Sequence, residues 1–150
     1  MKKLLLLFFV IFFIGCSKEQ KDENIGVVLG LSGKYASLGT EERDGIVLAF
    51  NEENYNLNGK FIHLVIKDDK QNEKVDKKVV KELIDKNIKI IIGNATSSMT
   101  KVTLNEIKNK NILLLSVTAS SNYFSNKDDN LIRLRGSFDY KTIINFLDKK

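Results

Sequence analysis

Blocks of apolar and polar residues alternate along the chain in a pattern that predicts strands separated by helices. Continuous apolar runs are typical of strands buried on both faces of a sheet, and they cover residues 25–31, 61–66, 88–93 and 112–115. A weaker fifth strand is expected over residues 131–134. Between the runs, apolar residues recur at helical spacing, most clearly at Val75, Val79, Val80, Leu83 and Ile84.

Three further helices complete the predicted order. One is expected to start at Thr40-Glu41-Glu42, because acidic residues suit a first turn. Another carries Val102 and Ile107, and a last one opens at Ser137. Alternating strands and helices with short links predict an α/β fold, a doubly wound parallel sheet with helices on both faces.

Ligands bind such sheets beyond the carboxyl ends of the strands. That rule selects three loops, residues 31–39, 94–98 and 116–121, which are rich in Ser, Thr, Gly and Ala. Hydroxyls and helix-start amides suit a carboxylate, although such residues also serve as ordinary helix caps and turns. The loops show no pairing of a base with a nucleophile, so no catalytic residue is assigned and the protein is not expected to be an enzyme.

Composition narrows the functions further. The 150 residues carry a net charge of +5, and the loss of Lys2 and Lys3 with residues 1–15 would leave +3, which is too mild to indicate a nucleic-acid partner. One Cys and one His exclude a disulfide scaffold and the Cys/His-rich zinc modules, so we expect neither a metal site nor a cofactor.

The N-terminal residues have the pattern that is typical of an export signal. Lys2 and Lys3 precede eleven consecutive apolar residues, a run too short to span a bilayer permanently. Phe13-Ile14-Gly15-Cys16 resembles the lipobox of bacterial lipoproteins, which implies removal of residues 1–15 and lipidation of Cys16. A plain signal peptide ending near a Cys is the alternative. Residues 16–24 then form a polar tether, and residues 25–150 form the folded part.

Several loops together resemble one family. They are Gly30 to Gly39, Leu57-Asn58-Gly59-Lys60, Val65 to Asp69, and Ile92 to Ser98. In order and spacing they are similar to the branched-chain amino acid binding proteins of ABC transporters, the Leu/Ile/Val class of type I periplasmic binding proteins. The Asp68-Asp69 pair, a hallmark of these proteins, is interpreted as a capping or turn-forming feature.

The resemblance implies roles for six residues. Ser97 would bind the ligand's carboxylate with its hydroxyl and helix-start amide, and Ser120 would do so from the next loop. The carbonyl of Thr118 would accept from the ligand's ammonium, with Ala119 between the two in the same ligand-binding stretch. Ser32 and Leu38 would line the side-chain pocket.

The resemblance also implies a function. It is that of a lipid-anchored solute-binding component, exported to the periplasm or cell exterior, that delivers a branched-chain or other neutral amino acid to an ABC permease in the membrane. The family has two lobes, and residues 25–150 match the N-terminal lobe, so we expect the second lobe to be absent. The alternatives are a ligand-sensing module of the same fold, reporting an amide or amino acid, and a non-functional gene fragment.

Overall fold

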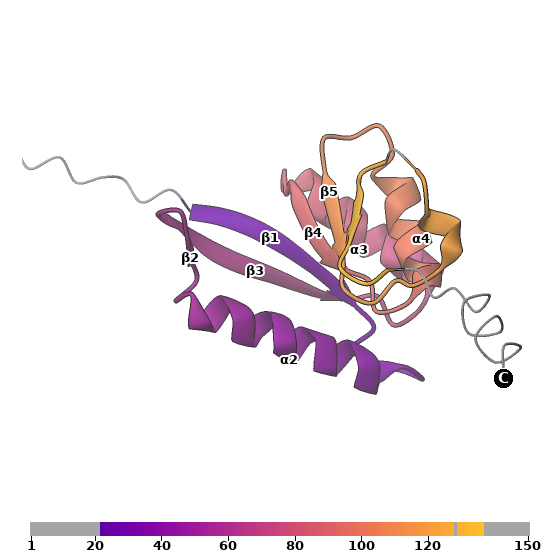
Figure 1. The fold of residues 1–150 in the computed structure, drawn as a ribbon, viewed down its shortest axis with the longest axis horizontal. Coiled ribbons are helices and arrows are strands. Elements are labelled where there is room, and N and C mark those ends of the chain that lie inside the picture. The colour runs from indigo at the N-terminus through magenta and orange to yellow at the C-terminus, as the bar shows by residue number, and fades with distance from the viewer. Residues whose placement is uncertain (1–21, 128, 137–150) are drawn as a thin grey trace, which may run out of the picture.

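The computed structural model describes residues 22–127 and 129–136 (Figure 1). The predicted signal peptide, Cys16 and the helix predicted from Ser137 lie outside these residues. The elements are, in chain order, β1 (Asp22–Leu29), α2 (Ala36–Glu52), β2 (Asn56–Leu57), β3 (Lys60–Asp68), α3 (Glu73–Asp85), β4 (Ile90–Gly93), α4 (Ser97–Glu106), β5 (Leu113–Ser116), the short 3₁₀ helix η1 (Asn122–Phe124) and β6 (Leu131–Arg133).

The strands form one sheet in the order β2-β3-β1-β4-β5-β6. Every neighbouring pair is parallel except β2 with β3, which form a hairpin. Its turn is Asn58-Gly59, and both residues have positive φ, 53° and 79°, as a two-residue hairpin turn requires. The predicted α/β fold with a doubly wound, mostly parallel sheet is confirmed.

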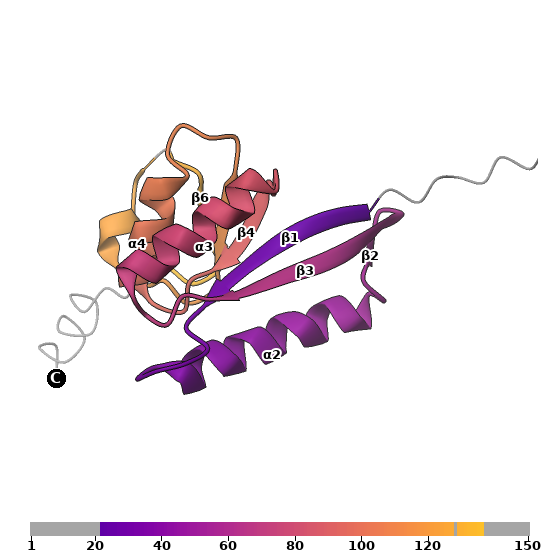
Figure 2. The same cartoon turned by 180° about the vertical axis from the view of Figure 1, so that it is seen from behind.

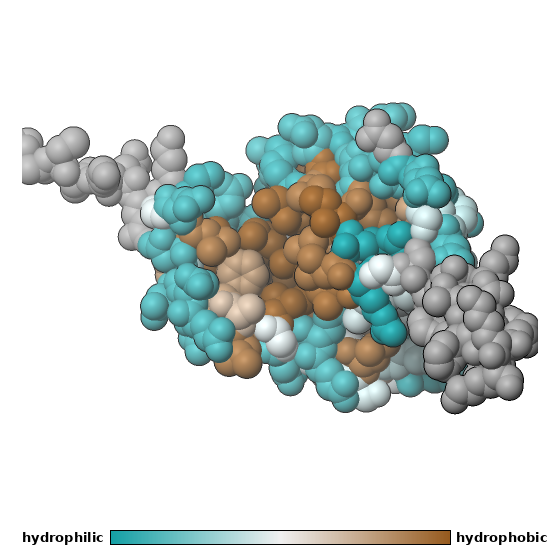
Figure 3. Space-filling model, in the orientation of Figure 1, coloured by the Kyte–Doolittle hydropathy of each residue, from teal (hydrophilic) through white to brown (hydrophobic). Residues whose placement is uncertain are grey.

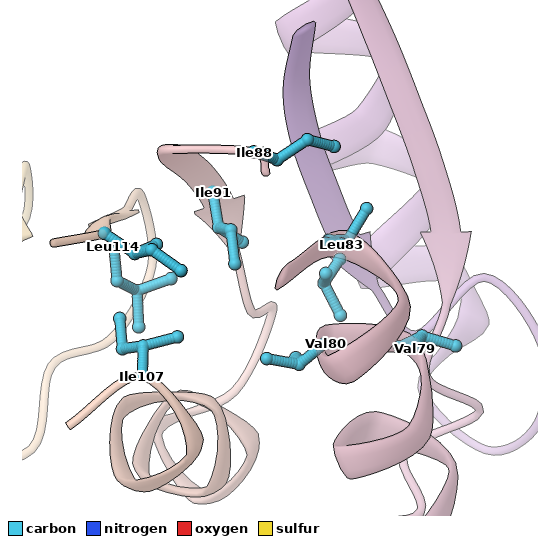
Figure 4. Close-up of a cluster of buried hydrophobic side chains, with 9 residues drawn as sticks. Val79, Val80, Leu83, Ile88, Ile91, Ile107 and Leu114 are labelled. Carbon is cyan, nitrogen blue, oxygen red and sulfur yellow. The ribbon is translucent and has the colours of Figure 1, made fainter. Parts of the chain in front are cut away.

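The two faces of the sheet are covered by different helices, because successive side chains of β1 point to opposite sides. Val28 packs with Val80 and Leu83 of α3, whereas Val27 and Leu29 pack with Ile46 of α2. Figure 4 shows the α3 and α4 side, where Leu83, Ile91, Ile107 and Leu114 point toward one another. Figure 2, seen from behind, places α3 and α4 together on the side away from α2.

Two boundaries differ from the sequence prediction. β1 begins at Asp22, where residues 22–24 pair with residues 61–63 of β3, so the last three residues of the predicted tether belong to the sheet. α2 begins at Ala36, one turn before the predicted start at Thr40. Glu42 therefore lies in the second turn of α2, on the side that faces the sheet, and not in an exposed first turn.

Helix α2 can approach the sheet closely because of Gly39. A Cβ at this position would collide with the carbonyl oxygen of Gly30 at the end of β1, whereas a Cβ at Gly45, two turns later, would meet nothing within 4 Å. We expect Gly39→Ala to lower the free energy of unfolding by about 1–3 kcal/mol through overpacking. Gly45→Ala should raise it by up to about 1 kcal/mol, because Ala is the better helix former. Urea unfolding followed by circular dichroism measures both, and an equal effect of the two substitutions would contradict this account.

Candidate functional site

The three predicted loops meet at the carboxyl edge of the sheet. From β1 the chain passes to β3 on one side and then returns to β4 on the other. This reversal opens a crevice beside the end of β1, the usual ligand site of open α/β sheets. Hydrogen bonds between the loops then fix their relative positions.

The loop after β4 presents the start of α4. Thr96 is the N-cap, and its hydroxyl accepts from the Met99 amide at 3.5 Å. Ser97 is the first helical residue, as predicted. The first amides of a helix have no acceptor within the helix and carry partial positive charge, so this end of α4 is suited to an anion.

The loop after β5 lies directly against that helix start. The Ser121 amide donates to Ser97 Oγ at 3.3 Å, and Thr118 Oγ1 lies 3.2 Å from the carbonyl oxygen of Ala95. Ser120 is half-buried, and among the described residues its hydroxyl has no hydrogen-bond partner. Ala119 is fully buried and its amide donates to Ser116 Oγ at 3.2 Å, so its side chain shapes the loop from inside.

The loop after β1 is held by Asp68, for which the sequence predicted only a capping or turn-forming role. Asp68 does accept from the Lys70 amide at 2.8 Å, but it also accepts from the Leu31 amide at 2.8 Å and from Ser32 Oγ at 2.6 Å. Burial raises the pKa of Asp68, but the hydrogen bonds from Ser32, Lys70 and Leu31 outweigh it and leave that pKa below its ordinary value. Because Ser32 donates its only hydroxyl proton to Asp68, the Ser32 hydroxyl can act toward any other group only as a hydrogen-bond acceptor.

A buried polar network lies beneath the loop after β4. The Asn94 amide group donates to Asp69 at 3.0 Å and to Asp76 of α3 at 2.6 Å, and Thr103 Oγ1 lies 3.0 Å from Asp76 Oδ2. All four side chains are fully buried. Burial, and then the nearby Asp69 charge, raise the pKa of Asp76 to about 7. Burial also raises the pKa of Asp69.

Sequence reasoning missed this network because its members are far apart in the chain. One signal was available. Asp76 shares the apolar face of α3 with Val79, Val80 and Leu83, at positions i, i+3, i+4 and i+7. A carboxylate on such a face is rarely buried unless it is paired.

Glu42 is a second residue that the sequence prediction did not assign to the site. It is 9% exposed, and its Oε2 lies 3.2 Å from Thr118 Oγ1. Burial raises the pKa of Glu42, and the hydrogen bond from Thr118 offsets this only in part. The available signal was its spacing, since Glu42 precedes Ile46 and Phe50 by one and two helical turns on the face of α2 that packs on the sheet.

An apolar groove of about 530 Å³, with Glu42 and Thr118 among its lining residues, lies between α2 and the strands β4 and β5, with Leu134 after β6 also on its wall. Figure 3 shows apolar side chains gathered across the middle of this face. Leu38, predicted to line a side-chain pocket, is 37% exposed and lies on the groove wall. The remaining lining residues are Glu41, Gly45, Ile46, Ala49, Phe50, Ile92, Leu115 and Val117.

The described part of the chain has no helix with the length and apolar character to cross a bilayer. Within the same residues, no three His, Cys, Asp or Glu side chains are grouped to hold a metal ion.

Comparisons with known proteins agree with this geometry. Residues 24–143 match the model of a family described as periplasmic binding protein. No curated protein matches significantly. A similar solved structure is the branched-chain amino acid transporter substrate-binding protein LivJ from Streptococcus pneumoniae in complex with isoleucine, with a TM-score of 0.77 and 28% identity over 87% of this chain.

Two more distant structures share the fold. The leucine-binding protein LivK from Thermotoga maritima has a TM-score of 0.71 and 18% identity over 81% of this chain. A solute-binding protein of an ABC transporter from Rhodopseudomonas palustris, in complex with 3,4-dihydroxy benzoic acid, has a TM-score of 0.72 and 18% identity over 77% of this chain. The chain covers 39%, 37% and 32% of LivJ, LivK and the third protein, respectively, so it spans about two-fifths or less of their length.

The Asp76 network predicts a pH dependence of stability. The pKa of Asp76 is about 7 when folded, against 3.8 ordinarily. Between these values the folded chain holds a proton that the unfolded chain releases, so stability falls as pH rises through this window and levels off above it. The contribution is at most about 1.4 kcal/mol per pH unit.

We expect Asp76→Asn to flatten this slope and to be more stable than the wild type at about pH 8, because Asn stays neutral and can still accept from Asn94. Some slope remains, since the raised pKa of Asp69 acts in the same direction. Asp85→Asn, at the exposed end of the same helix, is the control and should keep the wild-type slope. Urea unfolding at several pH values measures this, and an unchanged slope in Asp76→Asn would count against the network.

Proposed function

The chain belongs to the periplasmic binding protein family, and on that premise we propose that it is a ligand-binding lobe of the solute-binding component of an ABC transporter. Its ligand is a branched-chain or other neutral amino acid. The ligand is held at the crevice between the loops after β1, β4 and β5. The bound ligand is then passed to a permease in the membrane. The protein performs no chemistry on the ligand.

One observation carries this proposal. The hydrogen bond from the Ser121 amide to Ser97 Oγ joins the start of α4 to the loop after β5, so two groups of polar donors face the same crevice. Ser97, with the first amides of α4, is assigned to the carboxylate, and Ser120 adds a hydroxyl that has no other partner among the described residues. The Thr118 carbonyl is assigned to the ammonium.

The neighbours support the choice of ligand class. LivJ is in complex with isoleucine, and the Rhodopseudomonas palustris protein is in complex with 3,4-dihydroxy benzoic acid. Both compounds carry a carboxylate, which in isoleucine stands near an apolar side chain and in the benzoic acid is attached to an aromatic ring. An anion site at a helix start, with an apolar groove close by, suits that combination.

Calorimetric titration of the full chain with leucine tests the assignment. We expect Ser97→Ala and Ser120→Ala each to weaken binding roughly tenfold, because each removes a hydrogen bond to a charged group. Ser98→Ala is the matched control. Ser98 is the exposed second residue of α4, and its amide is retained in the variant. Leucine binding that is equally strong in all three variants would refute the site.

We also propose that the protein is exported and anchored through Cys16. The eleven-residue apolar run and the following Gly15-Cys16 support this, as does membership of a periplasmic family. Several acyl chains on one residue hold a protein firmly at a membrane, because each buried CH₂ contributes about 0.8 kcal/mol.

Bacteria expressing the full chain and fed labelled palmitate should incorporate the label into the wild type and Ser17→Ala. Cys16→Ser should remain unlabelled and leave the membrane fraction. Equal labelling of the Cys16→Ser variant would exclude lipidation at this residue.

A further inference from the structure

Gln71, in the loop after β3, reaches across the end of β1 to the loop after β4. Its Oε1 accepts a hydrogen bond from Thr96 Oγ1 at 3.0 Å. On the way the side chain passes directly over Gly30, where an added Cβ would stand 2.5 Å from Gln71 Nε2 and 2.7 Å from Gln71 Cγ. β1 lies between β3 and β4 in the sheet. One side chain therefore spans the centre of the binding edge, over a position that glycine keeps open.

The backbone that carries this side chain is held in an unfavourable conformation. Lys70 and Gln71 have φ values of 54° and 51°, in the left-handed region that is costly for a residue with a Cβ. Asp68 accepts from the Lys70 amide at 2.8 Å. Asp69 accepts from the Gln71 amide at 2.7 Å. Backbone of this kind persists only where its surroundings fix it, and it is concentrated at functional sites.

The hydrogen bond to Gln71 determines how Thr96 acts at the start of α4. A hydroxyl has one proton, and because Thr96 donates it to Gln71, the Thr96 oxygen can only accept from other groups. It accepts from the Met99 amide at 3.5 Å, and it lies 3.1 Å from Ser98 Oγ, which is then the donor. The Met99 amide is thereby capped, whereas the Ser97 and Ser98 amides, which have no acceptor within the helix, are left for an anion.

Gln71 performs this task with an uncharged group. A carboxylate could accept the same hydrogen bond, but its negative charge would stand beside the helix start and repel a ligand anion. We propose that Gln71 is a positioning residue for the ligand's carboxylate. Without touching the ligand, it fixes the Thr96 cap and so decides which amides of α4 remain free. This inference rests on the proposed function and adds to its site a residue from the loop after β3.

The other end of the same amide group separates a positioning role from a purely structural one. Gln71 Nε2 is buried and has no hydrogen-bond partner among the described residues. An unpaired buried donor lowers stability, so a side chain selected for the fold alone would not need this nitrogen. Replacing Gln71 should therefore affect ligand binding more than it affects folding.

Calorimetric titration of the full chain with leucine, together with urea unfolding, tests the inference. We expect Gln71→Met to weaken leucine binding roughly tenfold without lowering the free energy of unfolding, because Met fills a similar space and removes the unpaired donor. Gln71→Glu keeps an acceptor for Thr96, yet its charge should weaken leucine binding at least as much, and less so as salt is raised. Lys70→Gln, at the exposed neighbour with the same left-handed backbone, is the control and should bind as wild type.

Gly30 gives a second route to the same contact, which keeps the inference testable if Gln71→Met fails to fold. The three atoms nearest to a Cβ at Gly30 all belong to Gln71. Gly30→Ala should therefore displace the Gln71 side chain and weaken leucine binding. In a Gln71→Ala background the same substitution should add little, because the side chain that it would displace is gone. Purely additive effects on leucine affinity would count against the inference.

The outcomes separate the inference from the proposed function. Leucine binding that Gln71→Met leaves intact would overturn the role of Gln71 while the proposed function stands. Weaker binding in Gln71→Met with a matching loss of stability, and wild-type binding in Gln71→Glu, would assign Gln71 to the fold alone and overturn the inference. Absence of leucine binding by the wild type would overturn both.

Discussion

The shared amide of Asn94 is the constraint on which the binding edge depends. One side-chain nitrogen donates to the Asp69 carboxylate after β3 and to the Asp76 carboxylate in α3, and so ties both to the end of β4. Buried carboxylates are tolerated only when such donors reach them. Because Asn94 is fixed, the following residues enter α4 at a defined place, and Ser97 can meet the Ser121 amide. Asp68 holds the loop after β1 in a similar way, because it accepts hydrogen bonds from the Leu31 amide and from Ser32 Oγ.

Packing of α2 sets the second part of the site. Gly39 lets this helix lie directly against the backbone of Gly30, and the next turn then brings Glu42 under the loop that contains Thr118. An acidic side chain is thereby buried by the close approach of two backbones, and hydrophobic packing of Ile46 further along the helix keeps it there.

The parts of the fold that depend on local pattern could be read from the sequence. Continuous apolar runs predicted the parallel strands, and the family resemblance implied that the helix after the third predicted strand opens at Ser97. The start of α2 was missed because Tyr35, its N-cap, makes no side-chain cap hydrogen bond. Glu42 and Asp76 were missed because a carboxylate is expected to be solvent-exposed, and only the tertiary structure shows that these two are buried. Their partners, Thr118 and Asn94, lie far away in sequence.

The position of β1 bears on how an exported chain reaches its folded state. Residues 22–29 form a central strand, paired with β3 on one side and β4 on the other. This strand is made before both of its neighbours, whose paired residues are 61–68 and 91–93. Pairing of this kind spans long stretches of chain and forms slowly. The centre of the sheet can therefore close only after the chain has been made as far as residue 93.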